Sequence, residues 1–137
     1  MGRERVFREV GREVPRLESL RKATGQAKYT DDLRLPNMAY AALVRSPYSR
    51  ARVISIDMSK AEKVPGFLGC LLPEETPPEY FNCSGNPPSP LLMKDELVLT
   101  REPKVLGDRI ACVAAETEEA AREAADAVLV EYEVLPA

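Results

Sequence analysis

The stretch formed by residues 40–67 reads YAALVRSPYSRARVISIDMSKAEKVPGF, and its pattern predicts the first elements of the fold. Apolar residues cluster from Ala39 to Arg45, and Ser46-Pro47 ends the run because proline has no N–H to donate to a sheet. A second strand is predicted from Arg52 to Ile56, where Ile54 and Ile56 share one face at a period of two. The stretch therefore opens with two strands.

A short helix and a third strand should follow. Ser59-Lys60-Ala61-Glu62 has the pattern of a capping box, in which Ser59 would cap the first turn. Pro65-Gly66 keeps that helix short. The run from Phe67 to Leu72 is almost continuously apolar, which predicts a strand buried on both faces.

The last quarter of the chain predicts a strand, a helix and a strand. Ile110 to Ala115 is an apolar strand, and Thr117 should cap a helix with an apolar stripe at the helical period. Val128 to Leu135 alternates as a final strand. This order of elements predicts an α+β fold, in which helices pack on a mixed sheet. The unit from Ile110 to Leu135 would be a right-handed crossover if its strands are parallel neighbours. The predicted stripe comprises Ala120, Ala121, Ala124, Ala127 and Val128.

A long loop separates the two halves of the pattern. Six prolines lie between Pro73 and Met93, and regular periodicity disappears there. Loops longer than about 12–15 residues within a domain are usually functional or disordered. Both a functional loop and a tolerated surface insertion are consistent with this composition.

Composition excludes several classes of function. The net charge is −3 and no basic cluster is present, so the sequence does not support nucleic-acid binding. No apolar run is long enough for a membrane span and no signal-peptide core follows Met1, so a cytoplasmic location is expected. The three cysteines, Cys70, Cys83 and Cys112, form no C-x-x-C pair, which predicts reduced thiols.

Residues capable of chemistry are scarce. The chain has no histidine, which excludes histidine ligands and a serine–histidine triad, and its seven glycines form no phosphate-binding motif. Asp31-Asp32 and Glu74-Glu75 are interpreted as solvated carboxylates. Arg109 should form an ion pair with Asp108 or Glu102, although an anionic ligand is the alternative. No catalytic, cofactor-binding or metal-binding residue is predicted in this chain.

Several ordered segments together resemble one known family. The resemblance covers residues 15–137 and rests on segments near 24–32, 40–47, 55–57, 65–66, 107–117 and 130–136. These segments are similar to the α/β hammerhead domain of the xanthine dehydrogenase and aldehyde oxidase family of molybdenum hydroxylases. Two stretches depart from the commonest family pattern. The family often has histidines where this chain has residues 46–51, and it often has Glu-Pro where this chain has Asp108-Arg109.

The resemblance implies a domain from the start of a molybdenum-binding subunit. Residues 1–14 would be a lead-in and residues 15–137 the hammerhead domain of a longer protein. The parent enzyme would hydroxylate a heterocycle or aldehyde at a molybdenum–molybdopterin centre, with iron–sulfur clusters and FAD in other domains or subunits. Its partners would be the following molybdenum-binding domains and the iron–sulfur and FAD domains. The segment alone is expected to be inactive.

The family also implies one substrate-related role. Apolar side chains before an Asp-Glu pair line the substrate funnel in that family, and Leu91, Leu92 and Met93 precede Asp95-Glu96 here. The alternative is that these residues anchor the loop to the core. For the whole chain, the alternative is a free-standing protein-interaction or small-ligand binding module with the same fold.

Overall fold

Five strands, two α-helices and three 3₁₀ turns make up the secondary structure of the residues that the structure describes. The computed structural model describes residues 11, 13, 15–82 and 93–136. The chain divides into two units between Pro36 and Asn37. The first unit contains helix α1 (Ser19–Ala23) and the turn η1 (Thr30–Asp32), and neither buries a residue. The predicted boundary after residue 14 lies beside undescribed residues and stays a prediction.

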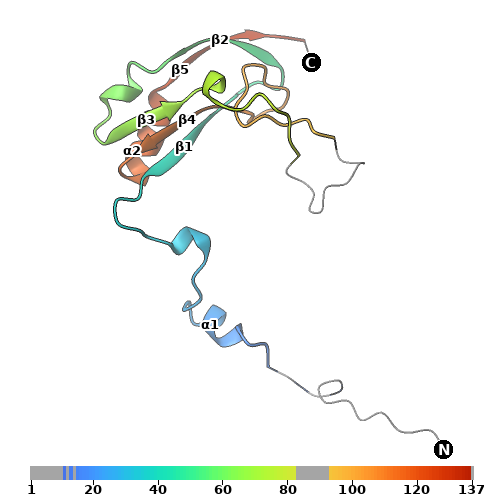
Figure 1. Ribbon diagram of the computed structural model, residues 1–137, viewed down its shortest axis with the longest axis vertical. Coiled ribbons are helices and arrows are strands. Elements are labelled where there is room, and N and C mark those ends of the chain that lie inside the picture. The colour runs from blue at the N-terminus through green and yellow to red at the C-terminus, as the bar shows by residue number, and fades with distance from the viewer. Residues whose placement is uncertain (1–10, 12, 14, 83–92, 137) are drawn as a thin grey trace, which may run out of the picture. The chain divides into compact units, whose positions relative to one another are not determined.

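The second unit contains all the strands, arranged in two antiparallel sheets. Strand β4 lies between β1 and β3 in one sheet, and β2 pairs with β5 in the other. Figure 1 shows the β2–β5 ribbon beside the three-stranded sheet. The strands are β1 (Tyr40–Arg45), β2 (Ala51–Asp57), β3 (Phe67–Leu71), β4 (Arg109–Ala115) and β5 (Leu129–Val134).

The α+β class and the terminal strand–helix–strand order are confirmed, but the single mixed sheet is not observed. Strands β4 and β5 flank helix α2 (Glu118–Ala127), yet they belong to different sheets and make no parallel pair. The predicted crossover geometry therefore does not arise. Each strand instead pairs with one that is distant in the sequence, as β1 does with β4, and strand periodicity carries no information about that choice.

Helix α2 covers one face of the three-stranded sheet. The Thr117 hydroxyl accepts a hydrogen bond from the Ala120 amide at 3.1 Å, which confirms the predicted cap. Ala121 and Ala124 are fully buried, and Ala125, which lies outside the predicted stripe, is buried as well. Methyl side chains allow the helix to approach the sheet closely. The core beneath it comprises Met58, Ala61, Val64, Val113, Ala124, Ala125 and Val128.

The predicted capping box at Ser59 is wrong. Only a 3₁₀ turn, η2 (Ala61–Lys63), forms there, and no side chain caps it. The Ser59 amide instead donates to the Asp57 side chain at 2.9 Å. Pro65 and Gly66, which has a φ of +85°, redirect the chain before an α-helical turn can form.

Strand β3 is not buried on both faces, contrary to the prediction. It lies at the sheet edge and pairs only with β4, while α2 covers one of its faces. Leu68 and Leu71 remain 55% and 38% exposed. An apolar run shows that a strand can be covered, but it does not show whether the covering element belongs to the same domain.

A further turn, η3 (Pro73–Glu75), opens the long loop, with proline in its first turn. The described parts of the loop, residues 76–82 and 93–100, leave the fold on the side away from α2 (Figure 1). Residues 97–99 and 104–106 form no strand. The segment 101–103 nevertheless lies along β2, since Ala51 and Val53 donate to the carbonyls of Pro103 and Arg101.

Candidate functional site

The predicted funnel residues lie in the long loop, and one of them is described. Leu91 and Leu92 fall outside the described residues. The Met93 side chain is 76% exposed, and its carbonyl accepts a hydrogen bond from the Asn82 side-chain amide. Met93 is therefore held through its backbone while its thioether chain reaches solvent.

Two short segments meet where the long loop joins the domain, and we call them the neck: Phe81–Asn82 and Met93–Leu97. The Phe81 amide donates to the Glu96 carbonyl at 2.9 Å, and the Glu96 amide donates back to the Phe81 carbonyl at 3.2 Å. This reciprocal pair is a single antiparallel bridge. It brings together residues that are 15 positions apart in the sequence.

Arg109 lies under the neck at the start of β4. Its Nη2 donates to a Glu96 carboxylate oxygen at 2.9 Å and to the Leu97 carbonyl at 3.0 Å. Its guanidinium carbon lies 5.7 Å from the centre of the Phe81 ring, within the range of a cation–π contact. The prediction of an Arg109 ion pair was right in kind, but the partner is Glu96 rather than Asp108 or Glu102.

Asp108 has a different task from the one predicted. One of its carboxylate oxygens accepts from the amides of Lys104 and Val105, at 2.6 and 3.1 Å. It thereby closes the turn 104–109, in which Gly107 has a φ of +89°. In the same turn the Lys104 ammonium lies 5.1 Å from the centre of the Tyr80 ring.

A small cavity of about 150 Å³ opens between this turn and the neck. Lys104 and Arg109 contribute positive charge to its wall, and both already contact aromatic rings. Four acidic side chains outnumber these two cations, so the cavity has no net attraction for an anion. The acidic side chains in its lining are Asp95, Glu96, Glu102 and Asp108.

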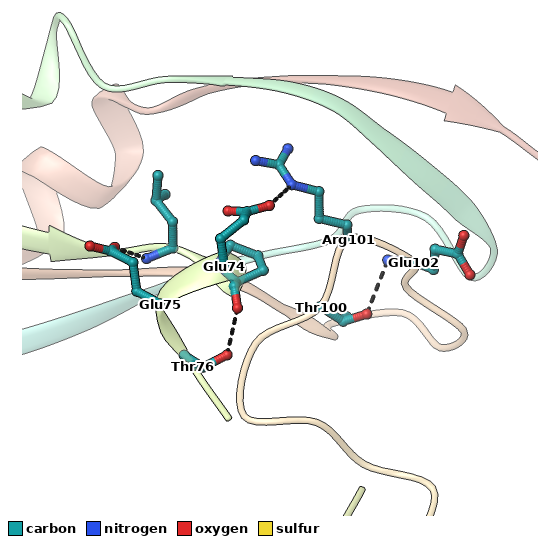
Figure 2. A network of polar contacts seen from close by, with 8 residues as sticks. Glu74, Glu75, Thr76, Thr100, Arg101 and Glu102 are labelled. Carbon is teal, nitrogen blue, oxygen red and sulfur yellow. Dashed lines mark hydrogen bonds and ion pairs between the residues drawn. The ribbon is translucent and has the colours of Figure 1, made fainter. Parts of the chain in front are cut away.

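An ion pair fixes the other end of the long loop. Glu74 in η3 accepts from Nε of Arg101, a residue that lies far along the chain in the segment beside β2 (Figure 2). This hydrogen bond lowers the pKa of Glu74. Glu75 accepts from the Leu72 amide at 2.8 Å. These carboxylates are exposed but partnered, so the interpretation of both as simply solvated is incomplete.

The described residues offer little for catalysis. No group of three or more Cys, Asp or Glu side chains within residues 15–82 and 93–136 is arranged to hold a metal ion. Cys70 and Cys112 are free thiols, and burial raises the pKa of each, so neither is activated as a nucleophile. Cys83 falls outside the described residues.

One sheet face is only partly covered by the described chain. It is the face of the three-stranded sheet opposite α2, and we call it the open face. Leu43 and Leu71, each 38% exposed, flank the half-buried Cys112 in directly paired positions. Exposed apolar side chains gathered on one sheet face are typical of an interface. The face comprises Ala41, Leu43, Leu71, Cys112 and Ala114.

Comparison with known proteins agrees with this architecture. Residues 24–136 match the family described as aldehyde oxidase and xanthine dehydrogenase, a/b hammerhead domain. The chain is 35% identical over 136 residues to the nicotinate dehydrogenase large molybdopterin subunit of Eubacterium barkeri, covering 98% of this chain and 30% of that protein. It is 40% identical over 130 residues to the xanthine dehydrogenase/oxidase of Rattus norvegicus, covering 93% of this chain and 9% of that protein.

A solved structure shows the same fold. The CO dehydrogenase of Oligotropha carboxidovorans superposes with a TM-score of 0.77 at 30% identity, over 92% of this chain and 15% of that one. The chain therefore belongs to the aldehyde oxidase and xanthine dehydrogenase family, as its α/β hammerhead domain. It spans less than a third of the length of these relatives.

The contacts at the loop ends were not predicted from the sequence. Glu74 and Arg101, and likewise Glu96 and Arg109, are oppositely charged residues on either side of proline-rich or irregular chain. The sequence could have suggested these ion pairs only if it had shown where the chain re-enters the domain after the loop. The proline at the start of η3 was the one local signal available.

Proposed function

We propose that this chain is a non-catalytic domain of a molybdenum hydroxylase subunit that hydroxylates a heterocycle or an aldehyde. The observation that carries the proposal is the family match over residues 24–136, together with the small share of each relative that the chain spans. The relatives' names include nicotinate and xanthine, which supports a heterocycle without selecting one. We place the enzyme in the cytoplasm; among the described residues, no helix is both long and apolar enough to cross a bilayer.

The cofactors of such an enzyme would be held elsewhere. A molybdenum–molybdopterin centre would supply the oxidative hydroxylation, and iron–sulfur clusters and FAD would carry the electrons away. Among the residues described here, no three Cys, Asp or Glu side chains are arranged to hold a metal ion. The contribution of the described residues is to shape the path of the substrate and to present a docking surface.

The open face is the proposed docking surface for the molybdenum-binding domains of the same subunit. Its apolar side chains are exposed in this chain, and the relatives are several times longer than this domain. Covering the face would remove the apolar side chains of Leu43 and Leu71 from water. Burial of apolar surface is the main favourable contribution to the free energy of association. A free-standing module would gain nothing from leaving them exposed.

A charge placed on the open face tests this docking role. Leu43→Asp in the assembled enzyme should lower the molybdenum content that co-purifies with this domain, because a carboxylate would be buried without a partner. Ile54→Asp is the matched control, since Ile54 is an exposed apolar residue on β2, outside the face. Unchanged molybdenum content in Leu43→Asp would show that the open face stays in solvent.

Met93 is the described residue that the proposal places in the substrate funnel. Apolar walls suit flat heterocycles because they desolvate a ring without demanding a fixed set of hydrogen bonds. The high exposure of Met93 supports this role over that of a core anchor, because a side chain that reaches solvent contributes little to packing.

Truncation of Met93 separates the two roles. Met93→Ala in the assembled enzyme should change KM or substrate preference and leave cofactor content and stability nearly intact. Val134→Ala truncates another exposed apolar residue, on β5, and should change neither. A stability loss of about 2 kcal/mol or more with unaltered kinetics would identify Met93 as a loop anchor.

A further inference from the structure

Arg109 contacts both segments of the neck from outside them, and the Asn82 side chain also joins the two segments through its hydrogen bond to the Met93 carbonyl. It reaches Glu96 and Leu97 through two hydrogen bonds from Nη2, and it reaches Phe81 through the face of the ring. Arg109 therefore contacts both residues of the backbone bridge, Phe81 and Glu96. Removing the guanidinium would take away the contacts that tie this bridge to β4, while the bridge and the hydrogen bond from Asn82 to the Met93 carbonyl would remain.

Arg109 makes its contacts with the neck from a central position in the sheet. It is the first residue of β4, which is the central strand of its sheet, and the residue after it, Ile110, is fully buried. The Arg109 carbonyl also accepts from the Thr100 amide at 2.8 Å. The loop neck is thus fastened to the most enclosed strand of the fold.

Burial strengthens the ion pair. The side chains of Arg109 and Glu96 are 32% and 33% exposed, so water screens them less than it screens the other described ion pairs. A planar guanidinium can donate to a carboxylate and a carbonyl while stacking on a ring, whereas an ammonium is a compact point charge. Lysine at this position would keep the charge and lose most of the geometry.

The turn that precedes Arg109 adds a second contact of the same kind. Lys104 lies over Tyr80, the neighbour of Phe81, and Asp108 holds the turn closed. Two cations from one turn therefore face two consecutive aromatic residues, one just before the neck and one at its start. The arrangement fixes the direction in which the chain leaves the domain.

We propose that Arg109 is a positioning residue for the substrate funnel, because it holds the neck in the arrangement that presents Met93. The inference rests on the proposed funnel function and deepens it. Met93 and Glu96 belong to the same neck segment, so a change in the seating of Glu96 is transmitted to Met93 over three residues. Arg109 itself need not touch the substrate.

Hydrogen exchange tests the clamp without any reference to activity. In the 137-residue chain, Arg109→Gln should make the Phe81 and Glu96 amides exchange about tenfold faster, the change expected for losing a charged hydrogen bond. Arg109→Lys should give an intermediate rate. Arg122→Gln, which removes an exposed ion pair with Glu118 on α2, should leave both amides unchanged. Equal exchange rates in Arg109→Gln and the parent chain would overturn the proposal.

Kinetics of the assembled enzyme test the positioning role. Arg109→Gln should raise KM or alter substrate preference in the same direction as Met93→Ala, with molybdenum content and kcat retained. Faster exchange combined with unchanged kinetics would overturn the inference if Met93→Ala still alters KM. If neither variant alters the kinetics, the funnel function itself fails, and the exchange result then describes a structural clamp alone.

Discussion

Single charged residues hold the long loop at both of its ends. Glu74 pairs with Arg101 at the beginning of the loop, and Glu96 pairs with Arg109 at its end. The first pair is the more exposed of the two, with side chains that are 36% and 55% exposed, whereas both side chains of the second pair are about two-thirds buried. An exposed pair of this kind contributes at most about 1 kcal/mol. We therefore expect the Arg109 pair to dominate the seating of the loop.

The Glu74 pair predicts a particular dependence of stability on pH. Because the hydrogen bond from Arg101 lowers the pKa of Glu74, its contribution is present above the ordinary carboxyl pKa of 4.5 and is lost as the pH falls through the lowered value. Glu74→Gln should therefore reduce stability by at most about 1 kcal/mol at pH 7, and by nothing once the parent carboxyl is protonated. Denaturation midpoints across this range measure the difference. A constant gap at all pH values would contradict the assignment.

The charge partners show how far residues can be interpreted from the sequence. Arg109 was expected to form an ion pair, and it does, but its partner lies 13 residues away rather than beside it. Asp108 was unavailable because its carboxylate closes the turn through two backbone amides. Sequence proximity favours the nearest opposite charge, whereas the chain uses that charge to build the turn.

Among the elements, helix α2 follows its sequence most closely. The Thr117 cap and the alanine stripe were predicted from local pattern, because a helix that packs on a sheet must place small side chains at the helical period. Ala124 is fully buried against that sheet and belongs to the same core as Val113. The helix therefore has no room for a larger residue there.

Enlarging Ala124 tests this packing. Ala124→Leu should overpack the contact between α2 and the sheet and cost about 1–3 kcal/mol of unfolding free energy, measured by denaturant titration. Glu123→Leu adds the same side chain at an exposed position of the helix and should cost far less. An unchanged midpoint in Ala124→Leu would mean that this helix face has free space.

The Thr117 cap gives an independent test of the same helix. Thr117→Ala removes the acceptor for the Ala120 amide and should cost about 1 kcal/mol. Thr117→Ser keeps the hydroxyl and should stay close to the parent chain. If the alanine and serine variants unfold at the same denaturant concentration, the hydroxyl does not cap the helix.

Sheets were less predictable than the helix. Each strand of the first sheet was located, but the pairing of β1 and β3 with β4 depends on contacts between residues that are far apart in sequence. The apolar run of β3 was interpreted as doubly buried, although one of its faces is open in this chain. That error is itself informative, because it marks a surface that the described residues cover only in part.

For the whole molecule, the order of the sequence segments was enough to infer the family. The role of this chain within a longer protein could not be inferred in the same way. The chain carries the hammerhead fold over residues 24–136, yet it spans 9% of its rat relative. Chemistry in such a protein would depend on groups contributed by other domains. In the proposed function, this domain docks through the open face and guides substrate at the neck.

Cofactor content distinguishes a non-catalytic domain from a complete enzyme. The 137-residue chain and the assembled enzyme that contains it would be purified in parallel and analysed for molybdenum, iron and flavin, with dye reduction measured on heterocycle and aldehyde substrates. We expect molybdenum and dye reduction in the assembled enzyme and neither in the chain alone. Stoichiometric molybdenum or substrate-dependent dye reduction in the isolated chain, or an assembled enzyme without molybdenum, would contradict this expectation.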